Sequence, residues 1–337
     1  MRAYHKFFLT GFVLLSSSAL FAQTAGTPDA LQLVAEGKQF LKEKKTAEAA
    51  GKFAEALKID PVNTNTLFLE GFCLIVTGRH DEALPYFEKI IAVPNNIPMA
   101  YAYIGDIHSI RREYDQAIAS YSKAAALMPR NSQVWYTLGL AYLQSGKSAQ
   151  AQAAEVESIK INAHTANNQQ IYAISAFAQG KNAEALLGFA SYLVSTSPKE
   201  NTAAESYRLL KIILKSNPKG AAVTDPIAKI QQALLVKTAA EAVAGKANLT
   251  SVDSLSMQLT SVFKAIKAQQ DQYGSPFFSK YYGDYFSALA ATENMETFAH
   301  LISRNQQPAE TEAWIKDHPD NIKALTDWLK DTKREIE

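Results

Sequence analysis

Residues 98–131 read PMAYAYIGDIHSIRREYDQAIASYSKAAALMPRN, and this 34-residue stretch decides the fold of the chain. Apolar and small side chains recur at helical spacing from Met99 to Arg111 and again from Tyr114 to Leu127. Pro129 closes the stretch, where the missing N–H and fixed φ of proline stop a helix. The stretch therefore predicts two amphipathic helices joined by a short turn.

The same pattern returns every 34 residues, in units that start at residues 30, 64, 98, 132 and 166. The eighth position holds glycine in four units: Gly37, Gly71, Gly105 and Gly139. The twentieth position holds alanine in all five units: Ala49, Ala83, Ala117, Ala151 and Ala185. The twenty-fourth position holds Phe53, Phe87, Tyr121, Glu155 and Phe189. Such a repeat builds a solenoid, in which each helix pair buries its apolar face against its neighbours.

Two of the units depart from the pattern. We expect the repeated glycine to lie where two helices pack too closely for a Cβ. In the fourth unit Glu155 and Ser158 replace apolar or small residues, which predicts that its second helix packs loosely. In the fifth unit Ala173 replaces the glycine, but Ala185 and Phe189 stay in register. We therefore interpret residues 30–199 as an array of about five repeats with a divergent last one.

These residues resemble the tetratricopeptide repeat family. The first half of the fourth unit matches the family pattern best, with Trp135, Leu138, Gly139 and Tyr142 in their expected places. The third unit matches over its whole length: Tyr101, Gly105, Ala117, Tyr121, Ala124 and Pro129. The resemblance implies an all-α fold, a right-handed α-solenoid of helix pairs. It also implies a non-catalytic scaffold that binds a protein or peptide in a concave groove lined by the first helices.

The resemblance also indicates where that partner would bind. Seven residues at the groove-facing positions form the predicted partner-binding groove: Lys38, Phe68, Phe72, Met99, Asp106, Tyr136 and Leu140. Some family members grip a C-terminal carboxylate with Lys, Arg and Asn side chains. The matching residues here are Val34, Lys38, Leu69, Met99 and Tyr103, and four of these five lack the needed charge or amide. Carboxylate capture is therefore not expected.

The groove instead favours an amphipathic helix or an extended apolar segment of a partner, because its large side chains are mostly apolar and aromatic. A second interpretation stays open. Phe68 and Phe72 are spaced i, i+4, so both could pack in the core against the next repeat or under the C-terminal helices.

Residues 200–337 lose the repeat but keep a helical pattern, and we expect a helical capping or extension region. Seven aromatic residues fall between Tyr273 and Phe286, and Trp314 and Trp328 follow. Their helical spacing favours a buried cap core. The alternative function is a repeat array that carries a C-terminal helical domain with enzymatic activity or with a carbohydrate or small-molecule pocket.

Composition and motifs argue against several kinds of chemistry. The chain has 34 Lys and Arg against 33 Asp and Glu, which gives no basic footprint for nucleic acid. We find no catalytic or phosphate-binding motif and predict no enzyme, no cofactor and no metal site. His300 and His318 flank acidic residues, but their spacing fits no ligand pattern. Cys73, the single cysteine, is expected to be a buried apolar residue.

The N-terminus has the features of a signal peptide. Arg2 and Lys6 precede an apolar run over residues 7–15, and Ala22 suits the position before a cleavage site. We expect removal of residues 1–22, a periplasmic or secreted protein, and no membrane insertion after cleavage. Self-association through the open end of the array is a further possibility.

Overall fold

The computed structural model describes most of the chain, and every regular element in the described residues is a helix. The described ranges are 27–94, 97–163, 165–197, 200–215, 226–269, 275–306 and 308–335. No described helix is long and apolar enough to cross a membrane. The predicted signal peptide, residues 1–22, lies outside these ranges and stays a prediction.

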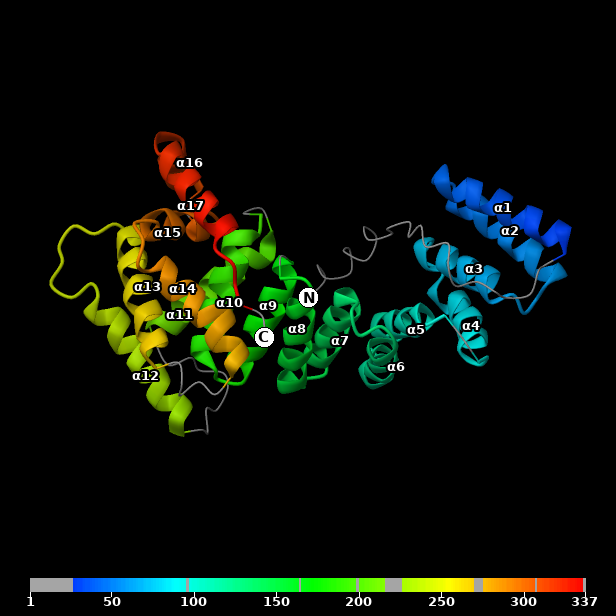
Figure 1. The fold of residues 1–337 in the computed structure, drawn as a ribbon, viewed down its shortest axis with the longest axis horizontal. Helices are drawn as coiled ribbons and strands as arrows, with labels where there is room; N and C mark the ends of the chain where they lie inside the picture. The colour runs from blue at the N-terminus through cyan, green and yellow to red at the C-terminus, as the bar shows by residue number, and fades with distance from the viewer. Residues whose placement is uncertain are drawn as a thin grey trace. The chain divides into compact units, whose positions relative to one another are not determined.

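The helices form two compact units, Met1–Met128 and Pro129–Glu337, which we call unit 1 and unit 2 and describe separately. Unit 1 consists of three helix hairpins, drawn in blue to blue-green in Figure 1. Its helices are α1 (Pro28–Lys42), α2 (Thr46–Ile59), α3 (Thr64–Val76), α4 (His80–Ile91), α5 (Met99–Ile110) and α6 (Tyr114–Leu127). The two helices predicted from residues 98–131 are thus confirmed.

The repeated glycine of unit 1 lies against the repeated aromatic ring, as the sequence predicts. A Cβ added to Gly37 would lie 2.5 Å from the Phe53 ring, and one added to Gly105 would lie 2.6 Å from the Tyr121 ring. Gly71 faces the Phe87 ring in the same way, at 2.8 Å. All three rings are buried. Position 8 must therefore be glycine, because a side chain there would overlap the ring that forms the centre of each hairpin.

The turn between the two helices is also repeated. The fifteenth residue of each 34-residue repeat has a positive φ: Lys44 (59°), Gly78 (79°), Arg112 (62°), Gly146 (77°) and Gly180 (74°). In each of these five repeats, the backbone N–H of the sixteenth residue donates to the carbonyl of the eleventh residue, for example from Glu113 to His108 at 2.8 Å. This hydrogen bond closes the first helix as in a Schellman motif. The fifth predicted repeat keeps this turn, so its two helices are joined in the same way as those of the first four.

Unit 2 contains the last two repeats and the C-terminal helices. The repeat helices are α7 (Ser132–Gln144), α8 (Ser148–Ile161), α9 (Ala166–Ala178) and α10 (Asn182–Ser195). The helices that follow are α11 (Asn201–Lys215), α12 (Pro226–Glu241), α13 (Ser251–Ala268), the π-helix η3 (Phe278–Asp284), α14 (Tyr285–Leu289), α15 (Met295–Ser303), α16 (Pro308–Asp317) and α17 (Pro319–Asp331).

The prediction that α8 packs loosely is wrong. Glu155 and Ser158 are completely buried, together with Ala151 and Ile159. Ser158 Oγ donates to the carbonyl of Ser132 at 2.7 Å and accepts a hydrogen bond from Asn168 at 2.6 Å. Polar contacts to α7 and α9 thus stabilise the packing of a helix that lacks the usual aromatic residue.

Helix α10 is the centre of unit 2. All of its residues from Asn182 to Leu193 are buried. It packs against α9, α11, α12, α15 and η3, and Figure 1 shows it within the C-terminal helices. A helix that is buried on every side belongs to a globular core rather than to an open array. The C-terminal helices therefore cover the last repeat, and the predicted boundary at residue 200 stays a prediction.

The aromatic stretch forms part of this core. The described aromatic residues between Phe277 and Phe286 are all buried. Tyr172 of α9 stacks on Tyr282 with ring centroids 5.1 Å apart and meets Phe277 edge to face at 6.1 Å. Tyr273 lies outside the described residues. These side chains are therefore part of the core of unit 2 and are not free to line a carbohydrate pocket.

Candidate protein-binding surface

An aromatic cluster of α3, α4 and α5 in unit 1 contains two of the predicted groove residues, Phe68 and Phe72. Tyr103 stacks on the buried Phe87 ring with centroids 5.1 Å apart and planes 14° apart. Phe68 meets Tyr103 edge to face at 5.6 Å, and Phe72 meets it at 6.2 Å. Phe68, Phe72 and Tyr103 are each partly exposed. We call these three residues the aromatic face.

The aromatic face combines the two interpretations of Phe68 and Phe72. Phe68 contacts the core ring of Phe87 at 5.9 Å, and Phe72 packs against the cluster around Phe53 and Cys73. The rings therefore contribute to the packing of the hairpins and are also partly exposed. Such rings are held in place before a partner arrives, which lowers the entropic cost of binding.

Tyr103 is a member of the face that the predicted groove omits. The sequence places it at a position used for carboxylate capture, where a tyrosine has no role. Burial raises the pKa of its hydroxyl, with a smaller effect from the nearby Asp106 carboxylate. A neutral, half-buried tyrosine is instead a typical anchor for an apolar partner. The sequence signal that could have indicated Tyr103 is the i, i+4 pair Phe68 and Phe72, because both rings contact a large side chain of the next repeat.

Asp106 is held inside its own hairpin. Its Oδ1 accepts a hydrogen bond of 2.6 Å from the Tyr121 hydroxyl. Burial raises the pKa of this carboxyl to about 7, although the bond from Tyr121 acts in the opposite direction. The role of Asp106 in a groove stays a prediction. In this structure one of its carboxyl oxygens is already hydrogen-bonded to Tyr121 of the neighbouring helix α6.

The other predicted groove residues are distributed over both units. In unit 1, Lys38 is exposed on α1, and Met99 is partly exposed at the start of α5. In unit 2, Tyr136 and Leu140 are partly exposed one turn apart on α7. Of the five carboxylate-capture positions, Val34 and Leu69 pack against an apolar cluster.

Comparison with known proteins identifies the repeats. Residues 34–97 and 132–165 match sequence models described as tetratricopeptide repeat, and residues 105–146 match a model described as TPR repeat. These residues are tetratricopeptide repeats. The matched residues include all of α3, which carries Phe68 and Phe72, and the part of α5 from Gly105 onward, whereas Tyr103 lies between the matched ranges.

Two similar proteins each match a little under a third of this chain. Anaphase-promoting complex subunit 3 of Schizosaccharomyces pombe is 29% identical over 97 residues, which are 29% of this chain and 15% of that protein. Hsp70-Hsp90 organizing protein 3 of Arabidopsis thaliana is 29% identical over 98 residues, 29% of this chain and 18% of that protein. This chain thus spans less than a fifth of each relative. The solved structure of PilF from Pseudomonas aeruginosa has a TM-score of 0.47 at 20% identity, covering 55% of this chain and 84% of PilF.

Outside the tetratricopeptide repeats, the two C-terminal histidines pack around a tryptophan. The indole of Trp314 lies between His300 and His318, with ring centroids 3.9 Å and 4.2 Å away. Burial lowers the pKa of His300, while the acidic neighbours Glu296, Glu310 and Asp253 act in the opposite direction. No group of three possible metal ligands occurs in the described part of the chain. Stacking therefore accounts for the position of both rings.

Unit 2 contains a buried polar network that sequence reasoning missed. Glu184 Oε2 accepts hydrogen bonds from Gln152 at 2.5 Å and from the Tyr172 hydroxyl at 2.9 Å. Burial raises the pKa of Glu184 and raises that of the nearby Glu155 well above its usual value. Neither carboxyl oxygen of Glu155 has a hydrogen-bond partner among the described residues. These residues connect α8, α9 and α10, and their burial closes them to a substrate.

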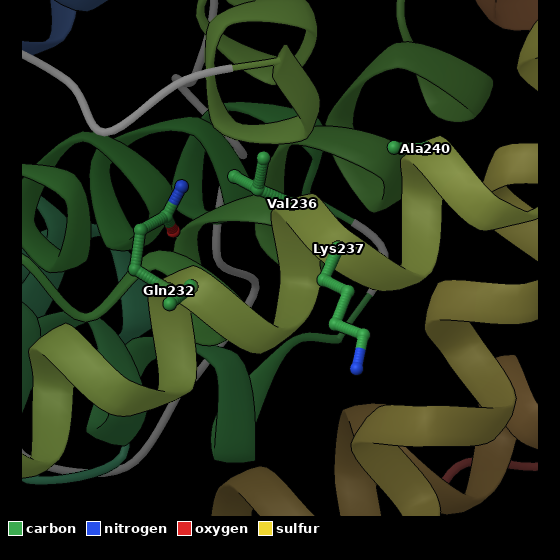
Figure 2. Close-up of a pocket in the computed structure, with 5 residues that line it drawn as sticks. Gln232, Val236, Lys237 and Ala240 are labelled. Atoms are coloured by element: carbon green, nitrogen blue, oxygen red, sulfur yellow. The ribbon is translucent and has the colours of Figure 1, made fainter.

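A shallow pocket lies on α12. Figure 2 shows four of its lining residues, Gln232, Val236, Lys237 and Ala240, along one helix. Ala233 is the fifth, and the pocket has a volume of about 330 Å³. Gln232 donates to the carbonyl of Ile213 at 3.0 Å, so its amide nitrogen is already bound. The pocket therefore offers mainly apolar surface and no set of converging polar groups.

Cys73 agrees with its predicted role. It is completely buried, and burial raises the pKa of its thiol to about 12. A thiol in this environment stays protonated and unreactive at neutral pH.

Proposed function

We propose that this protein is a non-catalytic tetratricopeptide-repeat scaffold, and that its aromatic face binds an apolar segment of another protein. The observation that carries the proposal is the partial exposure of Phe68, Phe72 and Tyr103 on α3 and α5. Large aromatic side chains contribute most to the free energy of interfaces, and here three of them converge on rigid helices.

The chemistry of the face selects the kind of partner. An amphipathic helix or an extended apolar segment would place its large side chains against these three rings. The names of the two similar proteins, a complex subunit and an organizing protein, support an assembly role for tetratricopeptide repeats of this kind.

The binding test compares two truncations in unit 1. Phe72→Ala removes a ring from the aromatic face, whereas Leu127→Ala removes an exposed side chain from α6, the second helix of the third repeat. Each variant is purified from cells with its bound proteins, and its melting curve is recorded. We expect Phe72→Ala to lose partners that Leu127→Ala retains, while unit 1 stays folded at the assay temperature and melts only moderately lower because the ring also packs against the cluster around Phe53 and Cys73. Equal recovery of partners would reject the aromatic face, and a large loss of thermal stability would assign Phe72 to the core.

We further propose that the scaffold acts in the cell envelope or outside the cell. The support is the basic start, the apolar run over residues 7–15 and the small residue Ala22. Mass spectrometry of the intact protein from its native host tests this part. A mature chain that begins at Gln23 is expected, and a chain that retains residues 1–22 in the cytoplasm would refute export.

A further inference from the structure

The segment after α17 is attached to unit 2 mainly through one side chain. Nη1 of Arg334 donates to Ser191 Oγ of α10 at 2.8 Å. The guanidinium carbon lies 4.0 Å from the ring centroid of Tyr285, 5.0 Å from that of Tyr281 and 5.5 Å from that of Phe286. In Figure 1 this segment leads from α17 back toward α10. Three elements, α10, η3 and α14, thus surround one cation.

The residues around the Arg334 guanidinium form a preformed site of buried side chains. Ser191 and the rings of Tyr281, Tyr285 and Phe286 are all nearly or completely buried. We call these four residues the guanidinium site. The π-helix η3, which carries Tyr281, is a rare form of helix that is frequent at functional sites.

The site is suited to arginine rather than to lysine. A guanidinium is planar and weakly hydrated, so it stacks on an aromatic face and still directs an N–H toward an acceptor. Arg334 does both, because it lies over Tyr285 and donates to Ser191. An ammonium would satisfy the charge but not the stacked geometry.

The rest of the segment is weakly held. The N–H of Thr332 closes the last turn on the carbonyl of Trp328, and residues 333–335 have no regular structure. Glu335 lies 4.0 Å from Lys280, and both side chains are exposed. An exposed pair at this distance contributes little. Arg334 can therefore leave without disrupting a helix.

We propose that the guanidinium site is a peptide-binding site, filled by Arg334 in this structure and by an arginine of another polypeptide when residues 332–335 detach. The contacts of the guanidinium indicate the ligand class, because an arginine side chain both stacks on Tyr285 and donates to Ser191. The ligand is an extended segment that presents an arginine. This inference is independent of the aromatic face of unit 1.

The test supplies the ligand from outside. Arg334→Ala empties the site in the full chain, and the probe is a fluorescent peptide with the sequence of residues 330–337, KDTKREIE. We expect the variant to bind this peptide about tenfold or more tightly than the unmodified protein does, because Arg334 in the same chain competes at high effective concentration. A peptide with alanine or lysine in place of the arginine should not bind the variant measurably.

A second measurement uses the unmodified protein, so that the test does not depend on how the variant folds. Ring currents should shift the Arg334 side-chain NMR signals upfield, and excess peptide should move them toward unshifted positions. Unshifted signals in the free protein, or signals that ignore the peptide, would overturn the proposal. Equal binding of the arginine and alanine peptides to Arg334→Ala would also overturn it.

Discussion

Replacing Gly105 by alanine tests the packing rule on which every hairpin of unit 1 depends. The new Cβ would lie 2.6 Å from two carbons of the Tyr121 ring, closer than side chains approach in real proteins. The ring has little room to move, because it is buried and its hydroxyl bonds Asp106 at 2.6 Å. The substitution therefore forces a choice between overlap and loss of that hydrogen bond.

The expected magnitude follows from three contributions. Overpacking a core costs about 1–3 kcal/mol. A weakened hydrogen bond between Tyr121 and Asp106 adds about 1 kcal/mol. Alanine regains about 1 kcal/mol of helix propensity over glycine. We therefore expect Gly105→Ala to lower the free energy of unfolding of unit 1 by about 2 kcal/mol.

Gly51→Ala is the matched control. Gly51 is exposed within α2, and a Cβ there would meet nothing within 4 Å. The control gains the same helix propensity without overlap, so it should stabilise unit 1 by about 1 kcal/mol. The two substitutions have the same chemistry and opposite predicted signs.

Urea unfolding followed by two signals measures the difference. The tryptophans Trp135, Trp314 and Trp328 all lie in unit 2, so their fluorescence reports on that unit. Circular dichroism at the helical band reports on both units, and hydrogen exchange in α5 and α6 isolates unit 1. The reasoning is refuted if Gly105→Ala raises the stability of α5 and α6 as Gly51→Ala does.

Three further predictions concern residues with unusual backbone or burial. Arg112→Gly should stabilise unit 1 by about 1 kcal/mol in urea unfolding, because φ there is +62° and only glycine adopts it without strain, whereas Gly78→Ala at the same turn position should destabilise. Glu155→Leu removes a buried carboxyl that has no hydrogen-bond partner among the described residues, so it should raise the free energy of unfolding of unit 2 at pH 7 by about 1–3 kcal/mol. The gain should be smaller near pH 4, because there the Glu155 carboxyl is protonated in both the folded and the unfolded chain. Thermal unfolding at the two pH values measures the difference. Burial raises the pKa of the Glu70 carboxyl from 4.5 to about 7. The free energy of unfolding of unit 1 should therefore be highest below pH 4.5 and should decline by up to about 3 kcal/mol as the pH rises to 7. A pH series of urea midpoints should show this decline in the unmodified protein and not in Glu70→Gln.

The fold of unit 1 could be predicted because its contacts are local and repeated. The spacing of Gly105 and Tyr121 sets one contact inside one hairpin, and the same spacing recurs in the other repeats. The helices predicted from residues 98–131 consequently agree with the structure. For Glu155, the sequence showed a polar residue at an aromatic position but not the bonds of Ser158 that keep α8 packed.

The candidate sites were harder to predict because they depend on exposure and on distant partners. The sequence placed Phe68 and Phe72 on one side of α3, but their partial exposure depends on Tyr103 of the next repeat. Arg334 and Ser191 are 143 residues apart, and no periodic pattern connects them. Long-range pairing of this kind has no signal in a single sequence.

A photocrosslinking amino acid in place of Phe72, compared with the same group in place of Leu127, tests the proposed binding surface most directly. Both positions are in unit 1, and only Phe72 belongs to the aromatic face. The account predicts that illumination in living cells links a partner protein to position 72 and not to position 127. Crosslinks of equal yield at both positions, or crosslinks at position 127 alone, would contradict it.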